Sequence, residues 1–286
     1  MKRRKLRIAV ILLLVAATTA WYVGPRPWMK LTMRVLGCEY KTIETPSFTA
    51  AYYDSGNENL PPMVLTHGFL VDGVLNWFNM VPRLKNTYRL IIPDLLNADH
   101  DYVRSGAFSF QEERNFLKEL CAVLELENPR MVFFSASSLL AADFTETAEV
   151  FLVSPPPLNE QDYFKDVDVV FRSDADWFAL STFTNPPPGM WLFTKFSHPQ
   201  WQNDFIRLHD AFVDHYPAWS RLDPDAENLR IIIPSDDRFF PSARSLLAHK
   251  NAMPLPKSGH GATWDQPEAL AAILLSPARN KLRIYP

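Results

Sequence analysis

The chain has 286 residues, 47% of them hydrophobic and 21% charged, which is enough for one large domain with a complete core or at most two smaller domains. The formal net charge of -3 at pH 7 lacks the basic excess of nucleic-acid-binding proteins, so no nucleic acid partner is expected. The two cysteines, Cys38 and Cys121, are too few for a disulfide framework and have no histidines at zinc-ligand spacing, so no metal site is expected.

Residues 1–25 predict a membrane anchor. The basic segment MKRRKLR precedes the apolar run IAVILLLVAATTAWYV, which covers residues 8–23. A basic flank before an apolar run is typical of a signal sequence or signal anchor. The segment Thr18-Thr19-Ala20 is a poor cleavage site, which favours a retained anchor. The positive-inside rule then predicts a single-pass membrane protein with a cytoplasmic N-terminus and its main domain extracytoplasmic, either periplasmic or lumenal.

Residues 26–37 predict a linker helix at the membrane interface. Helical spacing places four apolar side chains on one face and two basic side chains elsewhere, as in helices that lie on a bilayer. The apolar four are Trp28, Leu31, Val35 and Leu36, and the basic pair are Lys30 and Arg34. An ordinary amphipathic helix packed on the domain is the alternative.

Residues 38–154 and 229–276 predict an α/β core. Six short segments rich in branched or aromatic residues predict strands, at 48–54, 62–68, 88–94, 130–136, 149–155 and 230–236. Between them, residues 109–127 predict a helix, because Ser109 and Glu112 have capping-box spacing and apolar residues recur on one face. Strands that alternate with helices predict a mostly parallel central sheet with helices on both faces.

Residues 155–228 interrupt this alternation and predict a helical cap inserted over one end of the sheet, because so long a segment cannot be a bare loop. The segment is rich in proline and aromatic residues. Its aromatics, Trp177, Phe183 and Trp191 among them, are candidates to line an apolar acyl-binding pocket; the alternative is that they form a small core of the cap itself. Residues 277–286 form a basic tail without an assignable motif.

Four chemically useful sites lie where predicted strands end, and open α/β sheets bind ligands at the carboxyl ends of their strands. His67-Gly68 ends one strand, and His67 is a candidate to line the substrate pocket. The serine-rich corner around Ser137 ends another, Asp236 and Asp237 follow a third, and His260 lies between two glycines in a later turn.

Serine, aspartate and histidine in this chain order are typical of α/β-hydrolases. From about residue 38 to 275 the sequence resembles that superfamily, on His-Gly-Phe at 67–69, YRLIIPDL at 88–95, DDRFFP at 236–241 and SGH at 258–260. The predicted anchor and aromatic cap are similar to those of the membrane-anchored monoacylglycerol-lipase and esterase branch. The resemblance implies a serine esterase that needs no cofactor and acts on a lipid or small apolar ester.

The resemblance also implies a role for each matching residue. Ser137 matches the nucleophile, His260 the general base, and Asp237 the acid that orients the histidine. The backbone N–H groups of Phe69 and Ser138 match the donors that stabilise the oxyanion. The alternative for Ser137 is a structural, helix-capping serine.

The predicted nucleophile turn departs from the Gly-x-Ser-x-Gly pattern of the superfamily. The segment reads Ser135-Ala136-Ser137-Ser138-Leu139, and the helical run after it ends near residue 148. Leu139 adds side-chain volume where a glycine normally leaves room. An active ester hydrolase therefore competes with a membrane-tethered inactive homologue that binds a lipid or a partner protein. A purely structural envelope protein is a third hypothesis, and it predicts no ligand-sized cavity beneath the cap.

Overall fold

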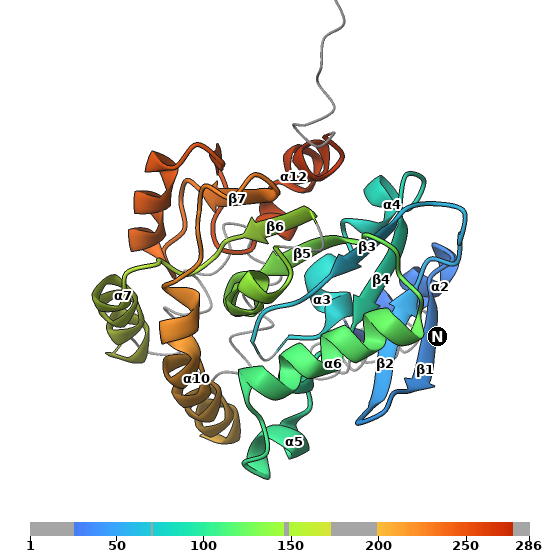
Figure 1. The fold of residues 1–286 in the computed structure, drawn as a ribbon, viewed down its shortest axis with the longest axis horizontal. Helices are drawn as coiled ribbons and strands as arrows, with labels where there is room; N and C mark the ends of the chain where they lie inside the picture. Colours follow the sequence, from blue (N-terminus) through green and yellow to red (C-terminus); the bar gives the residue numbers. More distant parts are fainter. Residues whose placement is uncertain (1–25, 70, 146–148, 173–198, 277–286) are drawn as a thin grey trace, which may run out of the picture.

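A computed structural model of the chain describes residues 26–69, 71–145, 149–172 and 199–276 (Figure 1). The predicted anchor over 1–25, the tail over 277–286 and the cap residues Trp177, Phe183 and Trp191 lie outside the described residues. Within the described part of the chain, no helix combines the length and apolar character needed to cross a membrane.

The centre of the domain is an eight-stranded sheet in the order β1-β2-β4-β3-β5-β6-β7-β8. The pairs β1–β2 and β2–β4 are antiparallel, whereas all pairs from β4 to β8 across the sheet are parallel. The strands are β1 (Glu39–Glu44), β2 (Thr49–Asp54), β3 (Pro62–Leu65), β4 (Arg89–Pro93), β5 (Arg130–Phe134), β6 (Glu149–Val153), β7 (Leu229–Pro234) and β8 (Ala252–Leu255). The prediction of a mostly parallel α/β sheet is confirmed.

All six predicted strands are present, but most end earlier than predicted. β5 and β7 are buried at every position, as strands covered on both faces must be. Ser135 and Ala136, which follow β5, are also buried and small, so the sequence pattern there continues past the point where the chain leaves the sheet. The two remaining strands were not predicted. β1 is largely exposed, and the short β8 contains Pro254, so neither has the apolar pattern of a central strand.

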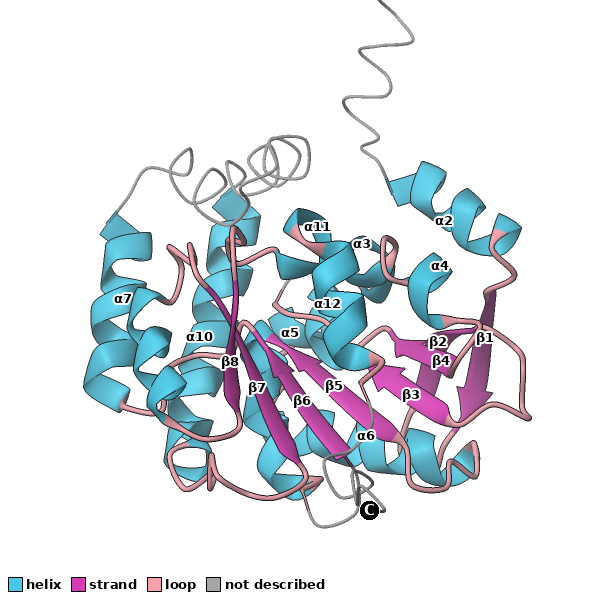
Figure 2. Cartoon of the chain, turned by 90° about the horizontal axis from the view of Figure 1, so that it is seen from above, coloured by secondary structure: helices cyan, strands magenta, loops and turns pink. Residues whose placement is uncertain are grey.

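Helices cover both faces of the sheet (Figure 2). One face carries α2 (Arg26–Val35), α3 (Gly73–Trp77), α4 (Val81–Leu84), α11 (Ala262–Asp265) and α12 (Pro267–Leu274). The other carries α6 (Phe110–Val123), the 3₁₀ helix η2 (Ser135–Asp143), α7 (Glu160–Arg172), α10 (Pro199–Trp219) and the 3₁₀ helix η3 (Pro241–Ala248). Two short elements, η1 (Leu96–Ala98) and α5 (His100–Arg104), follow β4. Each face therefore has its own apolar core, and the sheet separates the two.

The helix predicted over 109–127 is observed as α6. The Ser109 side chain accepts a hydrogen bond from the Glu112 N–H at 3.1 Å, which fixes the start of the helix. Phe116, Leu117 and Leu120 on its inner face are buried. The helix ends at Val123, because the chain reverses through Glu125, which has a positive φ of 51°.

The described ends of the predicted cap, α7 and α10, are helical and pack on the core. The hydroxyl of Tyr216 and the indole N–H of Trp219, both on α10, donate to the Pro157 carbonyl that follows β6. On α7, the buried Asp166 accepts hydrogen bonds from the Ser242 N–H at 3.0 Å and from its hydroxyl at 2.8 Å. These contacts fasten both ends of the insertion to the strand ends where ligands bind in such sheets.

A buried carboxylate fixes the loop after β4. Glu113 of α6 is fully buried, and its two oxygens accept the Asn97 side-chain amide at 2.7 Å and the Asn97 N–H at 3.0 Å. Burial raises the pKa of Glu113 from 4.5 to about 7, although the hydrogen bonds from Asn97 oppose this rise.

We expect this group to make stability depend on pH. Because the pKa of Glu113 is higher in the folded state, its stabilising contribution is complete below pH 4.5 and is lost as the pH rises through about 7. The unfolding free energy should therefore fall by about 3 kcal/mol across this interval, as measured by urea denaturation at a series of pH values.

Glu113→Gln should remove this decline, because the amide does not ionise. Glu127→Gln, which makes the same change at an exposed site, should retain the wild-type dependence. Parallel pH profiles for wild type and Glu113→Gln would contradict the assignment.

Candidate active site

Ser135 is the first residue after β5 and has a left-handed backbone, with φ of 54°. This conformation is uncommon for a residue other than glycine and is found at functional sites where the surrounding structure enforces it. Gly68, after β3, lies close against this turn. A Cβ at Gly68 would lie 3.2 Å from Ser135 Cβ and 3.3 Å from Phe134 Cδ1. Glycine at this position therefore allows the β3 loop to approach the serine turn.

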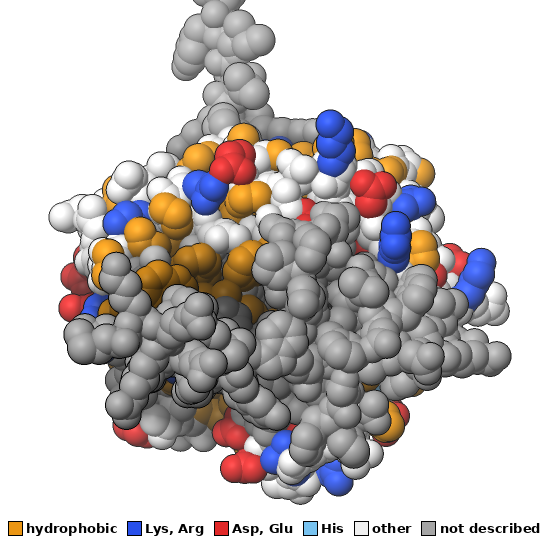
Figure 3. All heavy atoms as spheres, turned by 180° about the vertical axis from the view of Figure 1, so that it is seen from behind, with side chains coloured by type: hydrophobic (Ala, Val, Ile, Leu, Met, Phe, Trp, Pro, Cys, Tyr) orange, Lys and Arg blue, Asp and Glu red, His pale blue; other side chains and the backbone are white. Residues whose placement is uncertain are grey.

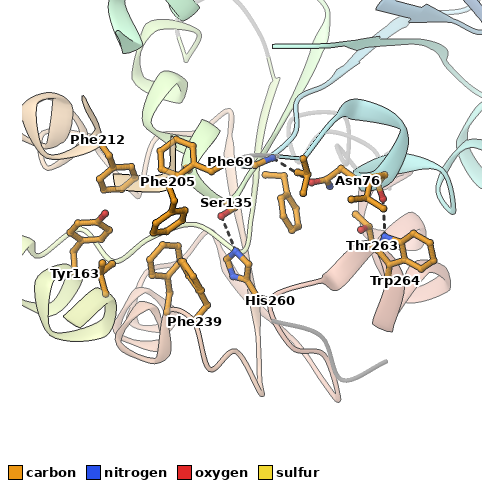
Figure 4. Close-up of a pocket in the computed structure, with 17 residues that line it drawn as sticks. Phe69, Asn76, Ser135, Tyr163, Phe205, Phe212, Phe239, His260, Thr263 and Trp264 are labelled. Atoms are coloured by element: carbon orange, nitrogen blue, oxygen red, sulfur yellow. Dashed lines mark hydrogen bonds between the residues drawn. The ribbon is translucent and has the colours of Figure 1, made fainter. Parts of the chain in front are cut away.

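His260 lies against Ser135, with 2.8 Å between the histidine Nε2 and the serine Oγ (Figure 4). The loop that carries His260 is held on both sides. The Ser154 hydroxyl donates to the His260 carbonyl at 2.9 Å, and the Gly259 N–H donates to Asp265 Oδ2 at 2.8 Å. The imidazole also contacts the ring of Phe239, with 4.9 Å between ring centroids. The ring is therefore fixed in place before any ligand binds.

Asp237 lies on the other side of His260 from Ser135, with 2.9 Å between its Oδ2 and Nδ1 of His260. Its other oxygen accepts the N–H groups of Phe239 at 2.8 Å and Phe240 at 3.0 Å, which fixes the carboxylate. A carboxylate only accepts hydrogen bonds, so we place a proton on Nδ1, which leaves Nε2 free to accept the Ser135 proton. The neighbouring Asp236 is exposed and bonds through its N–H to the Ser258 carbonyl.

The structure does not bring Ser137 to His260, which corrects the expectation from sequence. The Ser137 hydroxyl lies 2.8 Å from the Thr66 hydroxyl, accepts the Phe134 N–H at 3.0 Å and donates to the Phe134 carbonyl at 2.9 Å. The side chain thus ties the start of η2 back to β5 and across to the β3 loop. It is a structural residue of the turn that presents Ser135.

Alignment of the superfamily pattern on Ser135 instead of Ser137 changes which residues match it. The second glycine position becomes Ser137, which is small, and the first becomes Phe133, which is buried in β5. Leu139, whose volume conflicts with a nucleophile at 137, is a fully buried core residue. The sequence signal for Ser135 was its position directly after the apolar strand segment RMVFF, which was predicted to run two residues too far.

Of the two residues predicted to supply oxyanion donors, Phe69 lies at the pocket and Ser138 does not. Phe69 lies at the pocket beside Ser135, but the residue that follows Ser135 is Ala136, and Ala136 rather than Ser138 lines the pocket. Ser138 is fully buried, away from the cavity. Phe69 and Ala136, rather than Phe69 and Ser138, are therefore the two residues at the pocket beside Ser135.

His67 was predicted to line the pocket, but it is fully buried beneath it. Its Nε2 accepts the Leu95 N–H at 2.9 Å, so its proton is on Nδ1, which donates to the Gly68 carbonyl at 2.8 Å. His67 thus joins the β3 loop to the β4 loop and holds the backbone of Gly68 and Phe69 at the pocket.

Ser135 and His260 line a pocket whose cavity volume is about 80 Å³. Figure 4 shows aromatic side chains of the cap and the β7 loop on one side of the pair, and residues of α3 and α11 on the other. The first group includes Tyr163, Phe205, Phe212 and Phe239, and the second includes Asn76, Thr263 and Trp264. The lining is almost entirely apolar, so the cavity suits an apolar ligand on either side of the serine. In the described ranges no group of three histidine, cysteine or acidic side chains is placed to hold a metal ion.

Known structures share this arrangement of strands, although neither a protein-family model nor a curated protein sequence matches the chain. A membrane phospholipase A described as a bacterial virulence factor superposes with a TM-score of 0.65 at 18% identity, over 96% of each chain. A serine hydrolase from Cycloclasticus zankles gives 0.63 at 15% identity, over 83% of this chain and 96% of that one. The 2-hydroxy-6-oxo-6-phenylhexa-2,4-dienoate hydrolase of Rhodococcus sp. strain RHA1 gives 0.61 at 17% identity, over 83% and 98%.

The chain has the α/β-hydrolase fold. In α/β-hydrolases the nucleophile stands on a strained turn between a strand and a helix, with its hydroxyl exposed at the carboxyl end of the sheet. Ser135 occupies that turn in this chain, because it follows β5 directly and begins η2.

Ser137→Ala should destabilise this turn. The change removes a buried hydroxyl with three hydrogen-bond partners, so we expect the unfolding free energy to fall by about 1–3 kcal/mol in urea denaturation. Ser220→Ala, at an exposed site where the hydroxyl donates only to the Pro217 carbonyl, should change it by less than about 0.5 kcal/mol. Equal stabilities for the two variants would show that the Ser137 network does not hold the turn.

Proposed function

We propose that the chain is a serine hydrolase that cleaves a carboxylic ester of an apolar or lipid substrate through an acyl-enzyme on Ser135. The observation that carries the proposal is the continuous series from Ser135 through His260 to Asp237, at the wall of an apolar pocket. A serine activated in this way attacks carbonyl carbon at neutral pH, which an isolated hydroxyl does poorly.

The proposed reaction has two halves. As Ser135 Oγ bonds to the ester carbonyl carbon, Nε2 of His260 takes the serine proton, and Asp237 stabilises the resulting imidazolium. The carbonyl oxygen becomes an oxyanion that accepts hydrogen bonds from the N–H groups of Phe69 and Ala136. The intermediate then expels the alcohol, which takes the proton from His260. Water repeats the sequence on the acyl-enzyme, releasing the carboxylic acid and restoring Ser135.

The lining of the pocket supports an apolar substrate. An ester carbonyl placed at Ser135 would extend one substituent toward Tyr163, Phe205 and Phe212, and the other toward Trp264. Burial of alkyl chain against such side chains contributes about 0.8 kcal/mol per methylene. The similarity to a membrane phospholipase A supports a lipid ester in particular.

We also propose that residues 1–25 anchor the chain in a membrane, with the hydrolase domain extracytoplasmic. The basic and apolar patterns of this segment support the assignment. An enzyme anchored in this way meets lipid at high effective concentration.

The alternative of an inactive homologue rested on an obstructed nucleophile turn. The position of Ser135 removes that obstruction, because Leu139 belongs to the core and Gly68 leaves room for the turn. Catalysis is therefore the better-supported function.

Alanine substitutions at Ser135, Ser137 and His260 test the proposal. Ser135→Ala and His260→Ala should each lower kcat/KM for a short-chain aryl ester by at least roughly a thousandfold, because each removes a group that acts in the chemical step. Both should also abolish labelling by a fluorophosphonate. Ser137→Ala should retain labelling and lose no more than about tenfold in kcat/KM, because it acts only through the turn.

Circular dichroism and thermal melting of each variant provide the folding control. Loss of labelling in folded Ser137→Ala with labelling retained in Ser135→Ala would reassign the nucleophile. A folded wild-type protein that neither labels nor hydrolyses any ester would instead favour the inactive homologue.

A steric change tests the acyl side of the pocket. Val167 of α7 is buried at the lining, so Val167→Phe should shorten the space for an alkyl chain. We expect kcat/KM for a long-chain nitrophenyl ester to fall by about tenfold or more while that for the acetate changes little. Val123→Phe, at an exposed site on α6, should leave the ratio of the two values unchanged. An equal loss of kcat/KM on both esters would show that the alkyl chain of the substrate does not lie against Val167.

A further inference from the structure

Helix α2 has two apolar faces that point in opposite directions. Met29 and Met33 are buried, with 4% and 0% of their surfaces exposed, and they belong to the apolar core between α2, α3 and the sheet. Trp28, Leu31 and Val35 are 69%, 51% and 77% exposed. At 100° per residue these three lie within about 60° of one another and opposite the two methionines. A helix that only covered the domain would need the methionine face alone.

The helix is held firmly in this orientation. Its end is fixed by the N–H of Cys38, which donates to the Met33 carbonyl at 2.9 Å. The Lys85 ammonium donates to the Leu36 carbonyl at 2.6 Å, which joins the end of α2 to the segment after α4. Because the methionines are buried at the same time, rotation of α2 to bury Trp28 would expose them. The outward apolar face is therefore a fixed feature of the folded domain.

Basic groups flank this face. Lys30 and Arg34 are one turn apart, exposed, and lie between the buried and the outward apolar residues. The Lys30 ammonium lies 5.6 Å from the ring centroid of Tyr40, which is itself 50% exposed. Apolar and aromatic residues bordered by lysine and arginine match the interfacial region of a bilayer, in which alkyl chains lie beneath phosphate groups.

We propose that the outward face of α2, formed by Trp28, Leu31 and Val35 with Lys30 and Arg34, docks on a phospholipid bilayer that contains anionic lipid. The bilayer is favoured over a protein partner because residue 26 directly follows the basic and apolar segment 1–25, whose composition predicts insertion in the same membrane. An anchor that ends where α2 begins brings this face to the lipid surface.

Docking in this orientation turns toward the lipid the face of the sheet that carries two of the pocket-lining helices. Figure 2 shows α2 on the same side of the sheet as α3 and α11, which line the pocket. Hydrophobic side chains gather in one area of the surface seen from behind, with basic and acidic side chains at its margin (Figure 3). Phe78, at the end of α3, stacks on the pocket-lining Trp264 of α11 with 6.2 Å between ring centroids, and both are half-buried. Helix α2 packs on α3, and α3 and α11 line the pocket, so the proposed lipid contact and one wall of the pocket belong to the same layer of helices.

Depth-dependent quenching tests the contact without reference to catalysis. The full chain with Leu31→Cys is labelled with an environment-sensitive fluorophore and reconstituted in vesicles of phosphatidylcholine and phosphatidylglycerol that carry doxyl-labelled lipid. Burial raises the pKa of Cys38 to about 11 and of Cys121 to about 12, so labelling at neutral pH selects the introduced thiol. The matched control is Val123→Cys, on α6 across the sheet.

The proposal expects strong quenching at position 31 and little at position 123. Absence of quenching at position 31, or equal quenching at both positions, would overturn it. Energy transfer between labels at position 31 that persists in dilute detergent, without lipid quenching, would also overturn it and assign the face to a second copy of the chain.

A kinetic test rests on the proposed hydrolase function. Leu31→Glu combined with Val35→Glu should lower hydrolysis of phospholipid in vesicles by about tenfold or more, and leave hydrolysis of a soluble aryl ester unchanged. Equal rates for wild type and variant on vesicles would contradict the role of α2. If the wild type hydrolyses neither substrate, the proposed function fails, whereas the quenching result still decides the docking proposal.

Discussion

The left-handed backbone at Ser135 is the constraint on which the rest of the site depends. A side chain in this conformation is strained, so the neighbouring structure must hold it. Ser137 does so from the following turn, through its bonds to Phe134 and Thr66. Gly68, at the adjacent strand end, leaves room for the turn, because a side chain there would press against it. The strain therefore has a function, since this backbone places the serine hydroxyl at the imidazole of His260.

Buried polar groups hold the loops around this turn. His67 accepts the Leu95 N–H and so joins the β3 loop to the β4 loop. Glu113 accepts the Asn97 N–H and fastens the same β4 loop to α6 on the far side. Neither group touches the pocket, yet both fix backbone that would otherwise bury unpaired donors. The loops at the carboxyl edge therefore form one connected layer, and the proposed oxyanion donors at Phe69 and Ala136 belong to it.

The pocket and the outward face of α2 together suggest how an apolar substrate reaches the serine. The pocket combines segments far apart in sequence, since α3 and α11 supply one side and α7, α10 and the β7 loop supply the other. Helix α2 lies on the side of α3 and α11, so a bilayer bound there adjoins the pocket side built from the core rather than from the cap. Under the proposed function, the described cap helices would hold the acyl chain of the substrate.

The sequence alone determined the parallel α/β sheet, because buried strands and an amphipathic helix such as α6 have composition and spacing that few other folds satisfy. It also placed Asp236 and Asp237 after an apolar strand and His260 between two glycines, and the resemblance to α/β-hydrolases selected Asp237 of the two aspartates. It missed β1 and β8, whose exposed or proline-containing segments become strands only by pairing with neighbours. Only the tertiary structure decided between Ser135 and Ser137. Both serines lie in one small-residue corner, and the choice depends on where β5 ends and which hydroxyl faces a histidine 125 residues later. Such a contact is set by the packing of whole strands, which local sequence does not encode.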